Sequence, residues 1–336
     1  MSSNLHIQAI VQSIKAEEQS LRSQFPILAY QNMLGVSLLM CAVLAMLLVA
    51  GLYAVSYIPA WLCIVLIAFI TSISHEIEHD LIHKLYFKRN PVVHNLMMLI
   101  VWLMRPNTIN PWYRRKIHLH HHKVSGTNQD LEERLVGNGI KNPALRVVSI
   151  VDGLLGLIIS HRAFKREITG FRFLSIFNAG FPIATVYFGI LYGFIIFHSI
   201  DGFLYDTATH PTWLIDVMKW VDFLMVVLIA PNIIRSSSLN LVTSSMHYYG
   251  GVGNLMQQTQ VLNHWVFFPF QLFCFNFGNT HTIHHFLPNQ PFYIRQMISG
   301  RILPVMKHHG VRFNDIKSIK QANFYSASGL QSDKDM

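Results

Sequence analysis

Long apolar segments without charged residues alternate with polar and strongly basic segments along the 336-residue chain. Residues 33–55 and 58–74 form two such apolar segments, and only a short connection around Ser56 separates them. A helix of about 20 apolar residues is long enough to span a bilayer. The pattern therefore predicts a helical membrane hairpin near the start of the chain, and two further spans at 173–198 and 217–234.

Three shorter apolar stretches, at 92–104, 147–160 and 266–277, are too short to span a bilayer and predict re-entrant or interfacial helices. Residues 1–30 predict an amphipathic cytoplasmic segment that lies on or near the membrane. Residues 1–325 are expected to form one integral-membrane domain, followed by a polar, disordered tail at 326–336. The expected fold is an all-α membrane protein with about four transmembrane helices and a cytoplasmic helical cap; a six-span arrangement stays open.

The composition supports a membrane protein, because 51% of the residues are hydrophobic and only 13% are charged, against about 25% charged in soluble domains. More than half of the 26 basic residues fall within 83–173, whereas the loops at 56–58 and 199–216 contain none. This positive-inside bias places the large loop and both termini in the cytoplasm. Attraction to anionic lipid head groups accounts for the net charge of +9. No nucleic-acid motif appears, so no nucleic-acid partner is expected.

Histidines occur in three tight clusters, which read HEIEH, HLHHH and HTIHH. Spacings of three or four residues place side chains on one face of a helix. This rule selects eight imidazoles and turns His120 away from the others. Eight ligands are too many for one metal ion and suit two, and imidazole binds iron, copper, nickel and zinc. The candidates are His75, His79, His118, His121, His122, His281, His284 and His285.

Two further histidines lie near these clusters. His83 continues the face of His75 and His79 by one turn, and is either a ligand or a residue that supports one. His247 follows the fourth predicted span at its cytoplasmic boundary. The three cysteines all lie in apolar segments and are expected to be small buried hydrophobes rather than ligands or disulfides.

The three clusters, in this order and at this spacing from the apolar segments, resemble the histidine boxes of the membrane fatty acid desaturase and hydroxylase superfamily. The resemblance covers roughly residues 30–300. It implies two iron ions as cofactors, O₂ as co-substrate, and a long-chain acyl, alkyl or lipid substrate in the membrane. It also implies two electrons from an external donor of the ferredoxin, rubredoxin or cytochrome b5 type. No catalytic residue is expected beyond the metal centre.

The same resemblance adds three residues to the site. Family members have a further histidine ligand after the last span, often in NxxxH, and His247 matches its position, with Thr243 in place of the asparagine. An acidic residue soon after the second box is matched by Asp130, which is expected to orient a ligand imidazole. His247 thus brings the proposed ligands to nine.

The resemblance leaves the reaction open. The three-residue gap in HEIEH and the form of the other two boxes favour a desaturase over a hydroxylase, and a decarboxylase that makes terminal alkenes comes third. A third box beginning with His281 rather than Gln argues against front-end desaturases. HEIEH also satisfies HExxH, so a membrane zinc metalloprotease with Glu76 as general base is an alternative of another class. That alternative leaves the two HxxHH units unexplained.

Other residues give weaker signals. The segment RPNTINPW contains Arg105, Asn107, Asn110 and Trp112, which either meet an acyl head group or lie on a surface turn marked by its prolines. The basic run Arg114, Arg115 and Lys116 is expected to be a surface patch of the positive-inside kind. Glu132 and Glu133 are expected on a solvated loop.

Overall fold

The computed structural model describes residues 3–204 and 210–326, and these residues form helices and loops without any strand, as the all-α prediction requires. Except for Ser326, the predicted disordered tail lies outside the described residues. The helices are α1 (Ser3–Gln24), α2 (Gln31–Ala54), α3 (Ala60–Ile82), α4 (Pro91–Met104), α5 (Pro111–Val124), α6 (Leu131–Leu135), α7 (Pro143–Val151), α8 (Gly153–Glu167), α9 (Phe173–Gly180), α10 (Ile183–Leu204), α11 (Thr212–Leu224), α12 (Ala230–Met246), α13 (Phe268–Phe273), α14 (Phe277–Phe286), α15 (Phe292–His308) and α16 (Ile316–Lys320).

Three of these helices are long and apolar enough to cross a membrane: α2, α3 and α10. The predicted hairpin is present as α2 and α3, which pack against each other along their lengths. Large apolar side chains of α2, α10 and α11 are exposed, including Leu44, Leu48, Ile196 and Trp220. An apolar surface of this extent fits contact with lipid rather than with water.

The third and fourth predicted spans differ in detail from the helices observed. The segment predicted at 173–198 is interrupted near Pro182, so that α9 ends at Gly180 and α10 continues to Leu204. A proline ring lacks an amide donor and clashes with the preceding turn, which explains the break. The segment predicted at 217–234 lies in a continuous helical run from α11 through a π-helical turn, η2 (Met225–Ile229), into α12.

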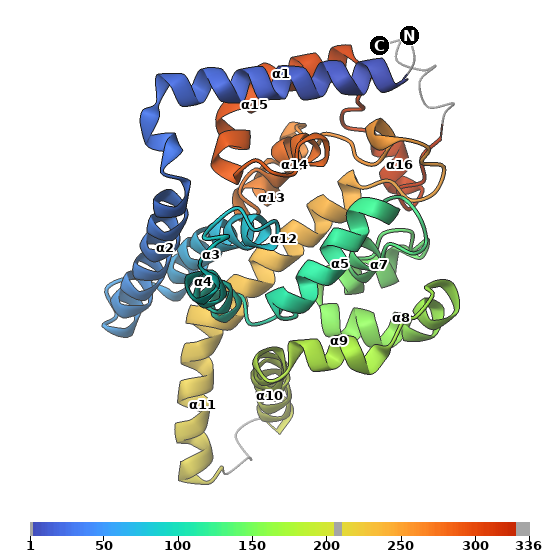
Figure 1. The fold of residues 1–336 in the computed structure, drawn as a ribbon. Coiled ribbons are helices and arrows are strands. Elements are labelled where there is room, and N and C mark those ends of the chain that lie inside the picture. Colours follow the sequence, from blue (N-terminus) through green and yellow to red (C-terminus); the bar gives the residue numbers. More distant parts are fainter. Residues whose placement is uncertain (1–2, 205–209, 327–336) are drawn as a thin grey trace.

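The N-terminal helix α1 is amphipathic, but its apolar face packs on protein. Ile10, Ile14 and Leu21 are buried in one cluster with Ile298 and Ile302 of α15. Figure 1 shows α1 and α15 side by side across one end of the molecule, while α2, α10 and α11 extend toward the opposite end. The apolar face of α1 is therefore covered by α15, and the position of this segment on or near the membrane stays a prediction.

The candidate site lies where α3, α5, α12 and α14 converge, between the α1–α15 layer and the apolar helices (Figure 1). The C-terminal half of α3, from Thr71 to Ile82, is almost entirely buried by α4, α5, α12 and α15. All of α14 except Asn279 is also buried. The histidines on these helices are therefore held by packed helices on several sides.

Candidate metal centre

Histidines from α3, α5 and α14, and from the residues that follow α3 and α12, meet in two compact groups. Within each group the four imidazoles each offer a nitrogen, and these nitrogens all lie within 4.8 Å of one another. The first group contains His79, His83, His118 and His284, and the second contains His121, His247, His281 and His285. Three clusters that are far apart in the sequence thus form two neighbouring sites.

His122 adjoins the first group. Its Nε2 atom lies 3.2 Å from Nε2 of His118 and 3.1 Å from Nε2 of His284. Its ring centroid also lies 5.1 Å from that of His285 in the second group. The half-buried imidazole of His122 is therefore placed between the two groups. By contrast His120 is exposed on the other side of α5, as its helical position predicts.

The spacing of the imidazole nitrogens fits a metal ion between them. Nε2 of His83 lies 3.0 Å from Nε2 of His118, and Nε2 of His285 lies 3.2 Å from those of His247 and His281. Ligand nitrogens about 2.0–2.1 Å from a shared metal ion are separated by roughly 3.0–3.4 Å. Several nitrogens also lack any hydrogen-bond partner among the described residues, including Nε2 of His79 and of His121.

His75 lies outside both groups. Its Nδ1 atom is 3.2 Å from Nη1 of Arg105 and 3.4 Å from Nη1 of Arg114. Hydrogen bonds from these two guanidinium groups hold the ring of His75, which lines a cavity beside the two groups. The overlapping unit His79–Asp80–Leu81–Ile82–His83 has the same HxxxH spacing and is the sequence signal for His83.

Carboxylates and other acceptors fix the orientation of the clustered rings. Nδ1 of His118 lies 2.7 Å from Oε2 of Glu132, and Nδ1 of His121 lies 2.8 Å from Oδ2 of Asp130. In each pair Nδ1–H donates to the carboxylate, which leaves the Nε2 lone pair free for a metal. The Asp130 contact is the one expected from the sequence, whereas the expectation that Glu132 lies on a solvated loop is wrong.

The rings of His247 and His285 are also held through their Nδ1 atoms. His247 places Nδ1 2.9 Å from the carbonyl oxygen of Thr243 and 3.2 Å from its Oγ1. The hydroxyl of Thr243 donates to Oε1 of Glu133 at 3.0 Å, and Glu133 is buried rather than solvated as expected. Nδ1 of His285 lies 3.0 Å from Oε1 of Gln258, a residue with no signal in the histidine pattern.

Burial and nearby charges set the protonation of these groups in opposite directions. Burial lowers the pKa of His118, His281, His284 and His285 well below the usual histidine value. These rings are therefore neutral, the form that binds metal. Burial also lowers the pKa of His121, but the nearby carboxylates, led by Asp130, outweigh it and raise that pKa to about 9, so a metal that binds Nε2 displaces a proton from this ring.

Buried ion pairs tie the first group to its surroundings. On α15, Arg295 Nη2 lies 3.1 Å from Oε2 of Glu76 and 3.4 Å from Oδ1 of Asp80. Its Nη1 donates to the carbonyl oxygen of Gln290 at 2.6 Å and lies 3.4 Å from Nδ1 of His284. This network fixes α3 and α15 relative to each other beside His79, which lies between Glu76 and Asp80 on α3.

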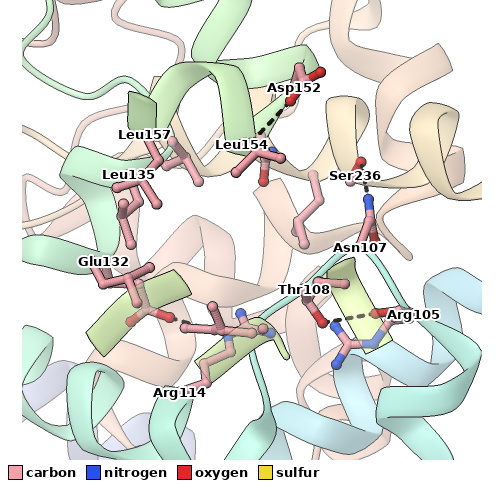
Figure 2. A pocket seen from close by; sticks show the side chains of 18 of the residues that line it. Arg105, Asn107, Thr108, Arg114, Glu132, Leu135, Asp152, Leu154, Leu157 and Ser236 are labelled. Carbon is pink, nitrogen blue, oxygen red and sulfur yellow. Dashed lines mark hydrogen bonds and ion pairs between the residues drawn. The ribbon is translucent and has the colours of Figure 1, made fainter. Parts of the chain in front are cut away.

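A cavity of about 400 Å³ opens beside the histidines, and His79, His118, His121 and His281 line one part of it. Figure 2 shows Arg105 and Arg114 on one side and Leu135, Leu154 and Leu157 on the other. The remaining wall is mainly apolar and comes from α8, α9, α10 and α12. This volume lies in the range of cavities that bind small molecules, about 300–1,000 Å³.

A family model described as fatty acid desaturase matches residues 55–317, which include all three histidine clusters and His247. The chain belongs to the fatty acid desaturase family. A comparison with curated proteins finds no match. Family membership and the apolar helices make the chain a membrane protein, and the histidine groups make it one with a candidate metal site.

The residues present fit the metal centre that the desaturase family implies. Two adjacent sites are formed entirely by imidazoles, which are suitable ligands for iron. Buried polar atoms are almost always hydrogen-bonded. The unpartnered nitrogens of His79 and His121 therefore indicate that these rings bind a group that is not part of the chain. The supporting contacts of Asp130, Glu132 and Gln258 are of the kind that metal-binding histidines make.

Proposed function

We propose that the protein is an O₂-dependent di-iron oxidoreductase that introduces a double bond into a fatty acyl chain. The observation that carries this proposal is the pair of buried imidazole groups beside an apolar cavity, in a chain of the fatty acid desaturase family. The reaction converts CH₂–CH₂, O₂, two electrons and two protons into CH=CH and two waters. The electrons come from an external carrier of the ferredoxin, rubredoxin or cytochrome b5 type.

Nine histidines are proposed to hold the two ions, and the geometry favours a change to the set predicted from the sequence. His83 replaces His75, because His83 is a member of the first group, whereas His75 belongs to neither group. When bound, the iron ions would supply the activation of O₂ that removal of hydrogen from an unactivated chain requires. The proposed ligands are His79, His83, His118, His121, His122, His247, His281, His284 and His285.

The protein's own residues provide orientation and a dry site. Asp130, Glu132 and Gln258 hold the ligand rings through Nδ1, so that the rings do not reorient when substrate binds. The apolar wall of the cavity, which includes Leu154 and Leu191, binds the alkyl chain and excludes water. The positive-inside bias supports a multi-pass topology with the site and both termini on the cytoplasmic side.

The metalloprotease alternative receives little support from the contacts of Glu76. A general base must reach its substrate or a metal-bound water, but Glu76 is buried in an ion pair with Arg295 and does not line the cavity. A hydroxylase would use the same imidazole groups, so the product decides between the two oxidations.

The test begins with purification of the protein in lipid nanodiscs, followed by measurement of iron by mass spectrometry. The expected result is two iron ions per chain. Turnover with a reductase and electron carrier should then give products that are two hydrogens lighter than the fatty acyl substrate. A gain of one oxygen would replace desaturation with hydroxylation, and a chain one carbon shorter would replace it with decarboxylation. A protein that binds no iron and oxidises no lipid would overturn the proposal.

A further inference from the structure

Arg235 is a buried arginine without an acidic partner. It lies on α12, is 1% exposed and lines the cavity. Its Nε donates to Oδ1 of Asn232 at 3.0 Å and its Nη2 donates to Oδ1 of Asn107 at 2.9 Å. It forms no ion pair with any residue in 3–204 or 210–326, and Nη1 has no hydrogen-bond partner there. Two amide oxygens are therefore the only acceptors that the described chain offers to this charge.

Such a charge is unusual, because buried arginines are almost always paired. The other fully buried arginines follow this rule: Arg105 pairs with Glu78, and Arg295 pairs with Glu76 and Asp80. Removing an ion from water is strongly unfavourable unless an opposite charge compensates it. Neutral amides satisfy the hydrogen bonds of Arg235 without balancing its charge. A cavity-lining cation of this kind points to an anion that the chain itself does not provide.

The surroundings of Arg235 increase the local positive charge. Arg105 and Arg114 also line the cavity and share one carboxylate, that of Glu78. Arg105 and Arg114 repel the charge of Arg235, and the carboxylate that attracts it, that of Glu78, is already paired with both of them. The remaining acidic residues of the cavity are already engaged with other partners. Asp152 accepts from Tyr192 and caps α8, Glu132 bonds to His118 and Arg114, and Glu133 bonds to Thr243.

The rest of the cavity indicates what carries the anion. Opposite Arg105 and Arg114, Leu135, Leu154 and Leu157 form an apolar wall (Figure 2), which α9 and α10 extend through Ile176 and Leu191. One cavity therefore combines a cationic wall with a larger apolar surface. This combination fits an amphiphile with a single oxyanion head group and an alkyl chain.

We propose that the cavity binds its substrate as a free fatty acid and that the guanidinium of Arg235 binds the carboxylate. The inference rests on the proposed function and names the substrate of the same site. A guanidinium matches the two oxygens of a carboxylate geometrically and bonds to them with charge assistance. The acid end of the chain is then held inside the cavity that Arg235 and His75 both line, and not at the protein surface. An acyl chain joined to a bulky carrier would leave Arg235 uncompensated.

The first arm of the test uses the unmodified protein. Metal-loaded protein in nanodiscs is titrated with dodecanoic acid, methyl dodecanoate, 1-dodecanol and dodecyl phosphate, each competing with a fluorescent fatty acid. Charge-assisted hydrogen bonds predict that the acid binds roughly 10- to 100-fold more tightly than the ester or the alcohol. Equal affinities would overturn the proposal. Stronger binding of the phosphate than of the acid would also overturn the carboxylate assignment and would point to a lipid phosphate.

The second arm uses variants. Arg235→Gln should lose the preference for the acid while the affinity for the alcohol stays the same, and Arg235→Lys should retain part of the preference. Arg301→Gln removes an exposed arginine paired with Glu17 and should bind all four probes as the unmodified protein does. If Arg235 only supports the fold, Arg235→Gln will weaken binding of acid and alcohol equally, which would overturn the proposal. If Arg235→Gln fails to fold, the unmodified protein still tests whether the cavity selects the acid, and a full preference for the acid in Arg235→Lys would overturn the role of Arg235.

The two proposals fail in different ways. Iron binding and lipid oxidation without acid selectivity would overturn the role of Arg235 and leave the proposed function intact. Acid-selective binding by a protein that holds no iron and oxidises no lipid would overturn the proposed function and leave the carboxylate site intact.

Discussion

The Nδ1 atom of His121 lies 2.8 Å from the Oδ2 atom of Asp130, although the two residues belong to different structural elements. His121 is on α5, whereas Asp130 is the residue that caps the N-terminus of α6 through its other carboxylate oxygen. One side chain thus fixes both the orientation of a proposed ligand and the start of the next helix. The two roles can be separated, because asparagine caps helices as well as aspartate does.

Asp130→Asn should keep α6 intact and weaken metal binding. The amide lacks the negative charge that makes the imidazole of His121 a strong ligand, and loss of such a partner costs roughly 10- to 100-fold in metal affinity. Metal affinity can be measured by competition with a chelator of known strength. Asp315→Asn is the matched control, because Asp315 caps a helix of the same length, α16, and its carboxylate bonds to Tyr248, Arg312 and the Ser318 amide rather than to a histidine. Equal affinities of the two variants would show that Asp130 does not act on the metal.

His83→Ala should remove most of the bound iron, whereas His75→Ala should leave the iron content close to that of the unmodified protein. The reason is that His83 belongs to the first imidazole group, whereas His75 lies outside both groups. Iron per chain is measured on purified protein by mass spectrometry. His120→Ala is the control, since His120 is an exposed histidine on a ligand-bearing helix. The opposite result, with iron lost from His75→Ala alone, would restore His75 as a ligand.

His75 and His83 show how much of the site can be predicted from the sequence. Helical spacing correctly separates His120 from its neighbours, because that rule depends only on positions along α5. The choice between His75 and His83 depends instead on which of them lies near His118 of α5 and His284 of α14, two helices that reach α3 from other segments. The contacts that Glu132, Glu133 and Gln258 make with or near the ligand rings likewise depend on tertiary packing. Sequence periodicity cannot report those contacts.

In the fold, too, the sequence pattern predicts the helices, but not which surfaces they pack against. The apolar length of α2 and α3 predicts a hairpin directly, because membrane helices must satisfy their own backbone hydrogen bonds. The amphipathic pattern of α1 correctly predicts a helix with one apolar face. That pattern cannot tell whether the face meets lipid or protein, and only the packing of Ile10 and Ile14 on α15 decides.

Arg295→Met should destabilise the protein by about 3–5 kcal/mol, because it leaves the buried carboxylates of Glu76 and Asp80 without their cation. The loss is measured as a lower unfolding temperature in nanodiscs. Arg301→Met on the same helix is the control, since exposed ion pairs contribute about 0–1 kcal/mol. If both variants unfold at the same temperature, the buried network does not hold α3 to α15.

Leu191→Trp should shift the enzyme toward shorter chains. Leu191 is buried and faces the cavity from α10, so a larger ring takes space that the alkyl chain would otherwise fill. Ile196→Trp adds the same ring at a mainly exposed position on α10 and should change nothing. The measurement is the distribution of product chain lengths from a mixture of fatty acids, with iron content as a check that the metal centre is intact. A tryptophan at 191 that lowers turnover equally for all lengths would indicate damage to the site. An unchanged distribution with full turnover would mean that the chain lies elsewhere, and the apolar wall would then need another role.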